Sequence, residues 1–236
     1  MNIVDVLIIL TILCAAVIGF KRGVLKELVM TVGFLLVFII SFYLKTPLAE
    51  WMSLHLPFFN FGGIVEGLTV LNIIFYQLVA FITVFSVIMA VFRVVLAVTG
   101  FIEKILKFTI ILGIPSKILG AIVGAIEGYI IAFLLVFLFN QPMFDVGIIN
   151  DSKYKDKILN STPILTNVVS SIGDTVTDVY NLVENNKDVK NKDQINRETI
   201  NIMLKHKVIS VKHIEKLIEK DKINVPGIDA VLNEYR

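Results

Sequence analysis

The sequence predicts an all-α membrane protein with four membrane-spanning helices, one interfacial helix and a small helical C-terminal tail. Hydrophobic residues make up 56% of the 236 residues and charged residues only 18%, whereas soluble domains carry roughly 45–50% and 25%. Four apolar runs approach the length of about 20 residues that crosses a bilayer core. Fourteen of the 22 Lys and Arg residues follow residue 140. These observations predict a membrane domain followed by a polar tail.

The first two apolar runs predict a helical hairpin. The first run, residues 2–20, lacks the basic segment that precedes a secretory signal, so we expect a span rather than a cleaved peptide. Lys21, Arg22 and Lys26 separate it from the second run, residues 28–44. Basic residues in short connections stay on the cytoplasmic side of a membrane. The N-terminus is therefore expected outside the cytoplasm.

Residues 45–66 predict a loop that lies on the outer membrane surface. Pro47 and later prolines and glycines interrupt this segment, and several aromatic residues suit the headgroup layer. The third apolar run covers residues 70–98 and carries Arg93 near its far end. We expect Arg93 to extend its guanidinium group to the cytoplasmic interface.

Residues 101–112 predict a helix lying flat at the interface, because charged residues fall on one helical face and apolar residues on the other. The segment Gly113-Ile114-Pro115 should break it, and Ser116 is expected to cap the next helix, residues 118–139. Three lysines in this connection favour the cytoplasmic side.

The fourth apolar run carries a stripe of glycines for helix packing. Gly120, Gly124 and Gly128 are four residues apart and lie on one helical face. Such a bare face allows close backbone contact with another helix. The sequence predicts packing against a neighbouring helix or against a second copy of the chain.

Three polar residues within the spans are candidates for mechanism: Asp5, Arg93 and Glu127. Arg93 and Glu127 both fall in the cytoplasmic halves of their spans, where they could form a structural ion pair or line a proton or substrate pathway. Asp5 is expected near the outer face, too far away to join them.

The charge distribution predicts a protein of the cell membrane whose two chain ends both lie outside the cytoplasm. Seven basic residues lie in or beside the two inner connections, against Lys45 alone in the outer loop. Lys153, Lys155 and Lys157 follow the last span on the predicted outer side, but long translocated tails obey this rule loosely.

The chain divides on composition into a membrane domain, residues 1–140, and three tail segments. An amphipathic helical segment covers residues 141–184, with a helix start at Thr162-Pro163. A polar linker follows at 185–194, and residues 195–236 predict three short helices. So short a subdomain makes a marginal core, so we expect the tail to contact a partner surface.

We expect no enzymatic activity, cofactor or metal. Phosphate-binding, zinc, serine-elbow and dinucleotide motifs are missing from the sequence, and Cys14 is the single cysteine. His206 and His213 should lie on different helices, which disfavours a metal pair. A formal net charge of +2 and an outer tail argue against nucleic acid binding.

The N-terminal half resembles the colicin V production (CvpA-type) family over roughly residues 1–140. The residues that carry the resemblance are Asp5, the stretch from Gly19 that ends in Arg22-Gly23-Val24-Leu25-Lys26-Glu27, and the stripe Gly120, Gly124 and Gly128. The resemblance implies a multi-spanning bacterial membrane protein associated with production of a secreted toxin. Some members carry an extracytoplasmic serine protease, whose motif this tail lacks. Many relatives have a basic residue where this chain has Glu127.

The resemblance implies a non-enzymatic component of toxin production or export, or of envelope maintenance. Its expected partners are the lipid bilayer, other envelope proteins or a second copy of the chain. A small-solute or proton-coupled transporter and a membrane-tethered signalling module, which needs a cytoplasmic tail, are the alternatives. The orientation of the helices in the membrane explains the basic residues of the motif but not Glu27, because acidic residues contribute little to membrane orientation. We therefore expect Glu27 to have a further role.

Overall fold

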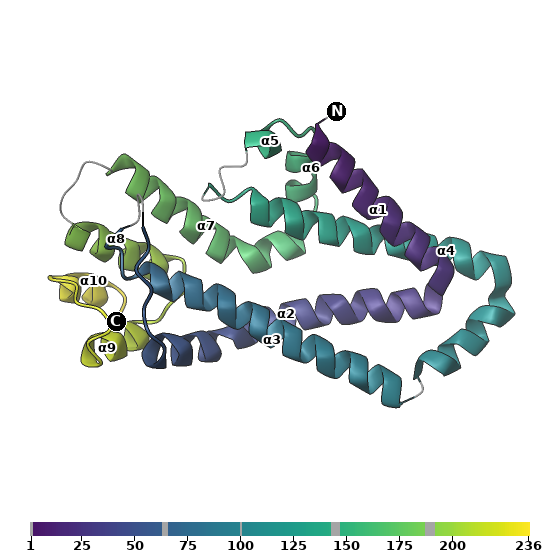
Figure 1. The fold of residues 1–236 in the computed structure, drawn as a ribbon, viewed down its shortest axis with the longest axis horizontal. Helices are drawn as coiled ribbons and strands as arrows, with labels where there is room; N and C mark the ends of the chain where they lie inside the picture. Colours follow the sequence, from purple (N-terminus) through teal and green to yellow (C-terminus); the bar gives the residue numbers. More distant parts are fainter. Residues whose placement is uncertain (1, 63–65, 100, 143–146, 187–191) are drawn as a thin grey trace. The chain divides into compact units, whose positions relative to one another are not determined.

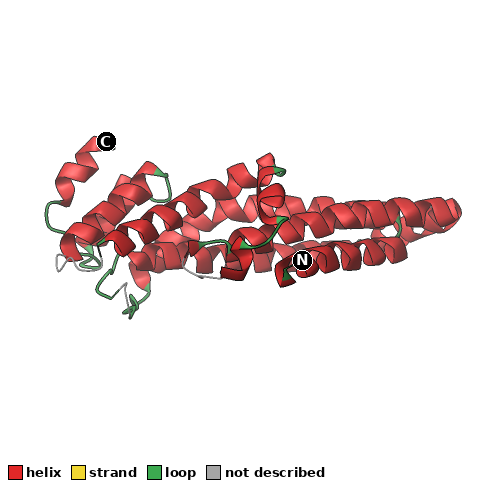
Figure 2. Cartoon of the chain, turned by 90° about the horizontal axis from the view of Figure 1, so that it is seen from above, coloured by secondary structure: helices red, strands yellow, loops and turns green. Residues whose placement is uncertain are grey.

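The computed structural model describes residues 2–62, 66–99, 101–142, 147–186 and 192–236, with the backbone alone described at 101–112 and 147–148. Within these ranges the regular structure is helical and contains no strand (Figure 2). The predicted all-α class is confirmed.

Four of the described helices are long and apolar enough to cross a membrane. They are α1 (Ile3–Arg22), α2 (Val24–His55), α3 (Leu71–Val98) and the second part of α4 (Phe101–Phe139), from Gly113 onward. The four predicted spans are therefore confirmed, and the chain is a multi-pass membrane protein.

Helix α2 continues through the segment predicted to be a loop. Its 32 residues extend about 48 Å at 1.5 Å per residue, against a hydrocarbon core of about 30 Å. The predicted loop is wrong as far as His55, because Pro47 lies inside the helix. Proline removes one backbone hydrogen bond, but Lys45, Ala49 and Ser53 recur every four residues on a buried face. Their packing stabilises the helix beyond the proline.

Helix α4 is two helical parts joined at Gly113, where the sequence predicts a break. Gly113 has φ 56° and ψ −136°, a conformation that side chains other than glycine rarely adopt. The first part, residues 101–112, is helical as predicted. The amphipathic face predicted for it depends on side chains that are not among those described. Ser116 does not act as predicted: its buried hydroxyl accepts the backbone N–H of Val24, at 3.3 Å, and so caps the start of α2.

Contacts group the chain into two units, each formed from segments far apart in the sequence. The first unit contains residues 1–41 and 85–166, and the second contains residues 42–84 and 167–236. The boundaries fall inside α2, α3 and the helix that begins at Pro163. This grouping differs from the predicted division at residues 140, 184 and 194.

In the first unit, α1 packs along α4 (Figure 1). Phe133 of α4 is fully buried, and Val136 is almost fully buried. Two short helices follow α4, namely α5 (Gly147–Asn150) and α6 (Lys155–Asn160), and α6 also packs on α4.

The second unit combines the tail with the adjoining ends of α2 and α3. Its tail helices are α7 (Pro163–Asn185), α8 (Lys192–Lys205), α9 (Val211–Glu219) and α10 (Ile228–Glu234). They match the predicted helix start at Pro163 and the three predicted short helices. Half of the predicted linker, residues 187–191, lies outside the described residues, whereas residue 185 ends α7 and residues 192–194 begin α8.

Candidate functional site

The connection between α1 and α2 is a single residue, Gly23. Its φ of 77° and ψ of 162° require glycine, and its N–H donates to the carbonyl of Gly19 at 2.9 Å. The chain therefore turns within one residue, and the motif residues on either side of Gly23 lie close together.

The three glycines of α4 pack directly on the backbone of α1. A methyl group at Gly120 would lie 2.9 Å from the Cα atom of Gly23, and one at Gly124 would lie 3.1 Å from the Cα atom of Gly19. At Gly128 it would lie 2.8 Å from the Cα atom of Ile12. The stripe therefore faces α1 of the same chain, and larger side chains would separate the two helices.

This close contact brings four polar side chains together, here called the motif cluster: Arg22, Glu27, Thr31 and Glu127. Glu27 is fully buried, and its Oε2 atom lies 3.2 Å from Nη1 of Arg22. The hydroxyl of the buried Thr31 donates to Oε2 of Glu127 at 3.2 Å. Thr31 lies four residues after Glu27 on the same face of α2, so its bond to Glu127 brings the carboxyl groups of Glu27 and Glu127 into one cluster, where they interact. The remaining oxygen of Glu27, Oε1, has no hydrogen-bond partner.

The predicted pairing of Arg93 with Glu127 is not observed. Among the described residues, Glu127 contacts Thr31 and Glu27 instead, and Arg93 lies exposed on α3 beside an open groove formed by Phe85, Ser86, Met89 and Ala90. The sequence placed Arg93 and Glu127 at similar membrane depth, but depth alone does not determine which helix faces which.

Asp5 is buried at the opposite end of α1, roughly 25 Å from Arg22 along the helix axis. Its Oδ1 accepts from the Ser152 hydroxyl at 2.7 Å and from the Lys153 backbone N–H at 3.0 Å. Its Oδ2 accepts from the backbone N–H of Asn2 at 3.1 Å. Asp5 therefore binds the segment after α4 to the start of α1.

Lys21 and Lys26 of the motif do not join the cluster in the described contacts. Lys21 is exposed and Lys26 is half-buried. Their predicted contribution is to orientation.

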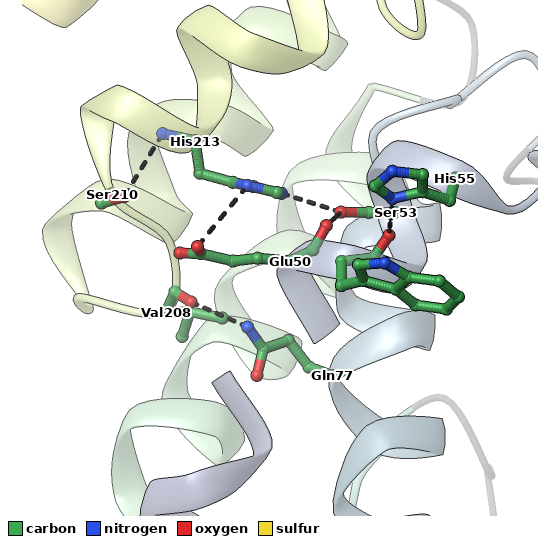
Figure 3. A network of polar contacts seen from close by, with 8 residues as sticks. Glu50, Ser53, His55, Gln77, Val208, Ser210 and His213 are labelled. Carbon is green, nitrogen blue, oxygen red and sulfur yellow. Dashed lines mark hydrogen bonds and ion pairs between the residues drawn. The ribbon is translucent and has the colours of Figure 1, made fainter. Parts of the chain in front are cut away.

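A second polar network lies in the second unit and joins α2 and α3 to the tail (Figure 3). Nε2 of the buried His213 lies 2.8 Å from the Ser53 hydroxyl, and Nδ1 lies 4.0 Å from Oε2 of Glu50. Gln77 donates to the carbonyl of Val208 at 3.2 Å. Its side-chain oxygen accepts from the ammonium group of buried Lys45 at 2.9 Å.

The comparison with protein families returns the colicin V production protein family over residues 4–162. The chain belongs to this family. The searches of curated proteins and of solved structures each return no match.

The colicin V production match contains every site residue predicted from the sequence, from Asp5 to Gly128. It ends one residue before Pro163, where α7 begins. The second polar network therefore joins α2 and α3, which lie within the matched region, to α9 and the loop before it, which lie beyond the match.

Ser53, His213 and Glu50 have the residue types of a hydrolytic triad, but their geometry fits a structural role. The Ser53 hydroxyl donates to the Glu50 carbonyl at 2.9 Å, so the imidazole N–H donates to Ser53 rather than accepting from it. Burial lowers the pKa of His213 to about 4, and the charge of Lys216 adds to this effect. An imidazole of such low basicity is a weak general base at neutral pH.

Sequence reasoning did not find this network, because Ser53 and His213 are 160 residues apart. The one available signal is the spacing of Lys45, Ala49 and Ser53, which places them on one face of a helix that Pro47 was expected to end. His206, which the sequence placed on a different helix from His213, lies 2.7 Å from Asp178 on α7.

Proposed function

We propose that this colicin V production family member is a non-enzymatic component of toxin production or export, or of envelope maintenance. In this proposal the spans anchor a helical tail outside the cytoplasm, and the tail binds an envelope partner.

The observation that carries the proposal is the hydrophobic core that the tail shares with α3. Val70, which directly precedes α3, and Ile73, in its first turn, are 0% and 2% exposed and pack with residues of α8 and α9. The tail residues in this core include Ile200, Met203, Ile214 and Leu217. Each fully buried side chain of this size contributes about 1.5–3 kcal/mol. The tail is therefore held on the helix end rather than tethered by a flexible linker.

The orientation in the proposal follows from charge and from Asp5. The end of α1 that carries Lys21 and Arg22 has the basic residues that stay in the cytoplasm. Asp5, at the other end of α1, bonds Ser152 and Lys153. The start of α1 and the segment leading to the tail then share the outer side.

Complementation of a strain that lacks this chain tests the function. The wild-type chain should restore toxin export and resistance of the envelope to detergent. Ile214→Asp places a charge in the shared core and should abolish complementation, although the chain remains in the membrane. Lys212→Asp introduces the same residue at an exposed position of α9 and should complement fully. Full complementation by Ile214→Asp would contradict a role for the folded tail.

A small-solute or proton-coupled transporter is the second candidate, because Glu27 is a buried carboxyl group with one unpartnered oxygen. A solute flux in reconstituted vesicles that Glu127→Gln removes would favour this candidate. The signalling alternative requires a cytoplasmic tail and is excluded if the tail lies outside.

A further inference from the structure

We propose that Glu27 and Glu127 bind one exchangeable proton, which they share in a hydrogen bond between their carboxyl groups. This inference goes beyond the proposed function and does not depend on where the tail lies. It assigns a ligand, H⁺, to Glu27, the motif residue that membrane orientation does not explain.

The hydrogen-bond partners in the cluster leave one place for this proton. Oε2 of Glu27 is held by Arg22 and Oε2 of Glu127 by the hydroxyl of Thr31. Oε1 of Glu27 is buried without a donor. Two ionised carboxylates are acceptors only and cannot bond to each other. A single proton converts one of them into a donor and satisfies the orphaned oxygen.

The charges in the cluster require the same proton. Among the described residues, the charged groups that act on Glu27 are Arg22 and Glu127. One guanidinium and two carboxylates sum to one uncompensated negative charge, which is expensive within a membrane span. Adding one proton makes the cluster neutral. Two carboxyl groups at such close range keep a proton between them for this reason.

Helix packing fixes the two carboxyl groups in this position. The contact of Gly124 and Gly128 with α1 sets the distance of α4, which presents Glu127, to the α1–α2 turn. Thr31 lies one helical turn after Glu27 on the same face of α2 and orients Glu127. Arg22 is 33% exposed, so the cluster has one polar side through which a proton can exchange with water.

Asp5, the other buried acid of the first unit, has a different environment. Its carboxylate accepts hydrogen bonds from three donors, on Asn2, Ser152 and Lys153. These donors favour the ionised form, so Asp5 should not contribute a protonated carboxyl group.

Infrared difference spectroscopy of the full chain in lipid nanodiscs tests the proposal. The wild-type chain at neutral pH should show the C=O stretch of a protonated carboxyl group, which shifts in D2O and disappears at alkaline pH. Glu27→Gln and Glu127→Gln should each lose this band, because the introduced amide N–H takes the place of the shared proton. Both amides keep the shape of the side chain. The matched control Glu219→Gln, at an exposed position of α9, should retain the band.

Three results would overturn the proposal. The wild-type chain would lack the band at neutral pH if both carboxylates are ionised. A band that survives in both variants would belong to another carboxyl group. A band lost in only one variant would show a proton on one carboxyl group that is not shared. Thermal unfolding of each variant checks that the first unit is folded. A folded amide variant that keeps the band is sufficient, by itself, to reject the site.

Discussion

At the residue scale, protonation of His213 opposes the fold of the second unit. Its side chain is 2% exposed and contacts Ser53 and Glu50 of α2. Lys216 lies one turn further along α9 and disfavours a second positive charge. The neutral ring therefore fits its site, and the protonated ring does not.

Stability of the second unit should fall as the pH is lowered from about 6.5 to about 4. The pKa of His213 is about 4 in the folded chain, against about 6.5 in an unfolded one. The unfolded state binds the proton first, so the contribution of His213 is complete above the unfolded pKa and is lost as the pH falls to the folded one. The loss is on the order of 3 kcal/mol. Hydrogen exchange of the α9 amides across this range measures it.

His213→Gln provides the control for this pH dependence. Glutamine keeps a donor for the Ser53 hydroxyl and does not titrate, so the exchange rates of α9 should become nearly independent of pH. An unchanged pH dependence in His213→Gln would assign the effect to another group and contradict the account.

At the element scale, the contact between α1 and α4 depends on the absence of side chains. A Cβ atom at Gly124 would meet the backbone carbonyl of Ala15 and lie 3.1 Å from the Cα atom of Gly19. Backbone atoms cannot move aside as a flexible side chain does. The geometry of the motif cluster therefore depends on these glycines, although none of them carries a functional group.

Gly124→Leu should destabilise the first unit by about 1–3 kcal/mol, because overpacking a tight contact forces the backbones apart. Unfolding of the purified chain in mixed detergent measures the change. Ile122→Leu lies on the exposed face of the same helical turn and should change the free energy of unfolding by less than about 0.5 kcal/mol. Equal stability of the two variants would contradict the observed contact.

The elements were largely predictable because each depends on local signals. Apolar runs, the Gly113 break and the Pro163 start all mark helix positions without reference to the rest of the chain. The exceptions depend on distant contacts. Packing retains α2 beyond Pro47, and Ser116 binds Val24, 92 residues away. Neither partner can be identified from one sequence.

At the scale of the whole molecule, each of the two units is formed from two segments that are far apart in the sequence. Helices α2 and α3 each contribute one end to the first unit and the other to the second. Composition divides the chain at residue 140, because polar residues begin there. It does not reveal that Val70 and Ile73 complete the core of the tail. For the same reason the sequence identified Glu27 and Glu127 separately but paired Glu127 with Arg93.

The account depends most directly on the side of the membrane at which the tail folds. A single cysteine at Glu219, an exposed position at the end of α9, with Cys14 replaced by serine, reports it without disturbing the Ser210 cap of that helix. The matched control is a cysteine at Lys21 in the motif. In intact cells, a membrane-impermeant maleimide should label the Glu219→Cys chain, whereas Lys21→Cys should react only after permeabilisation. Labelling of Glu219→Cys only after permeabilisation would place the tail in the cytoplasm and contradict the account.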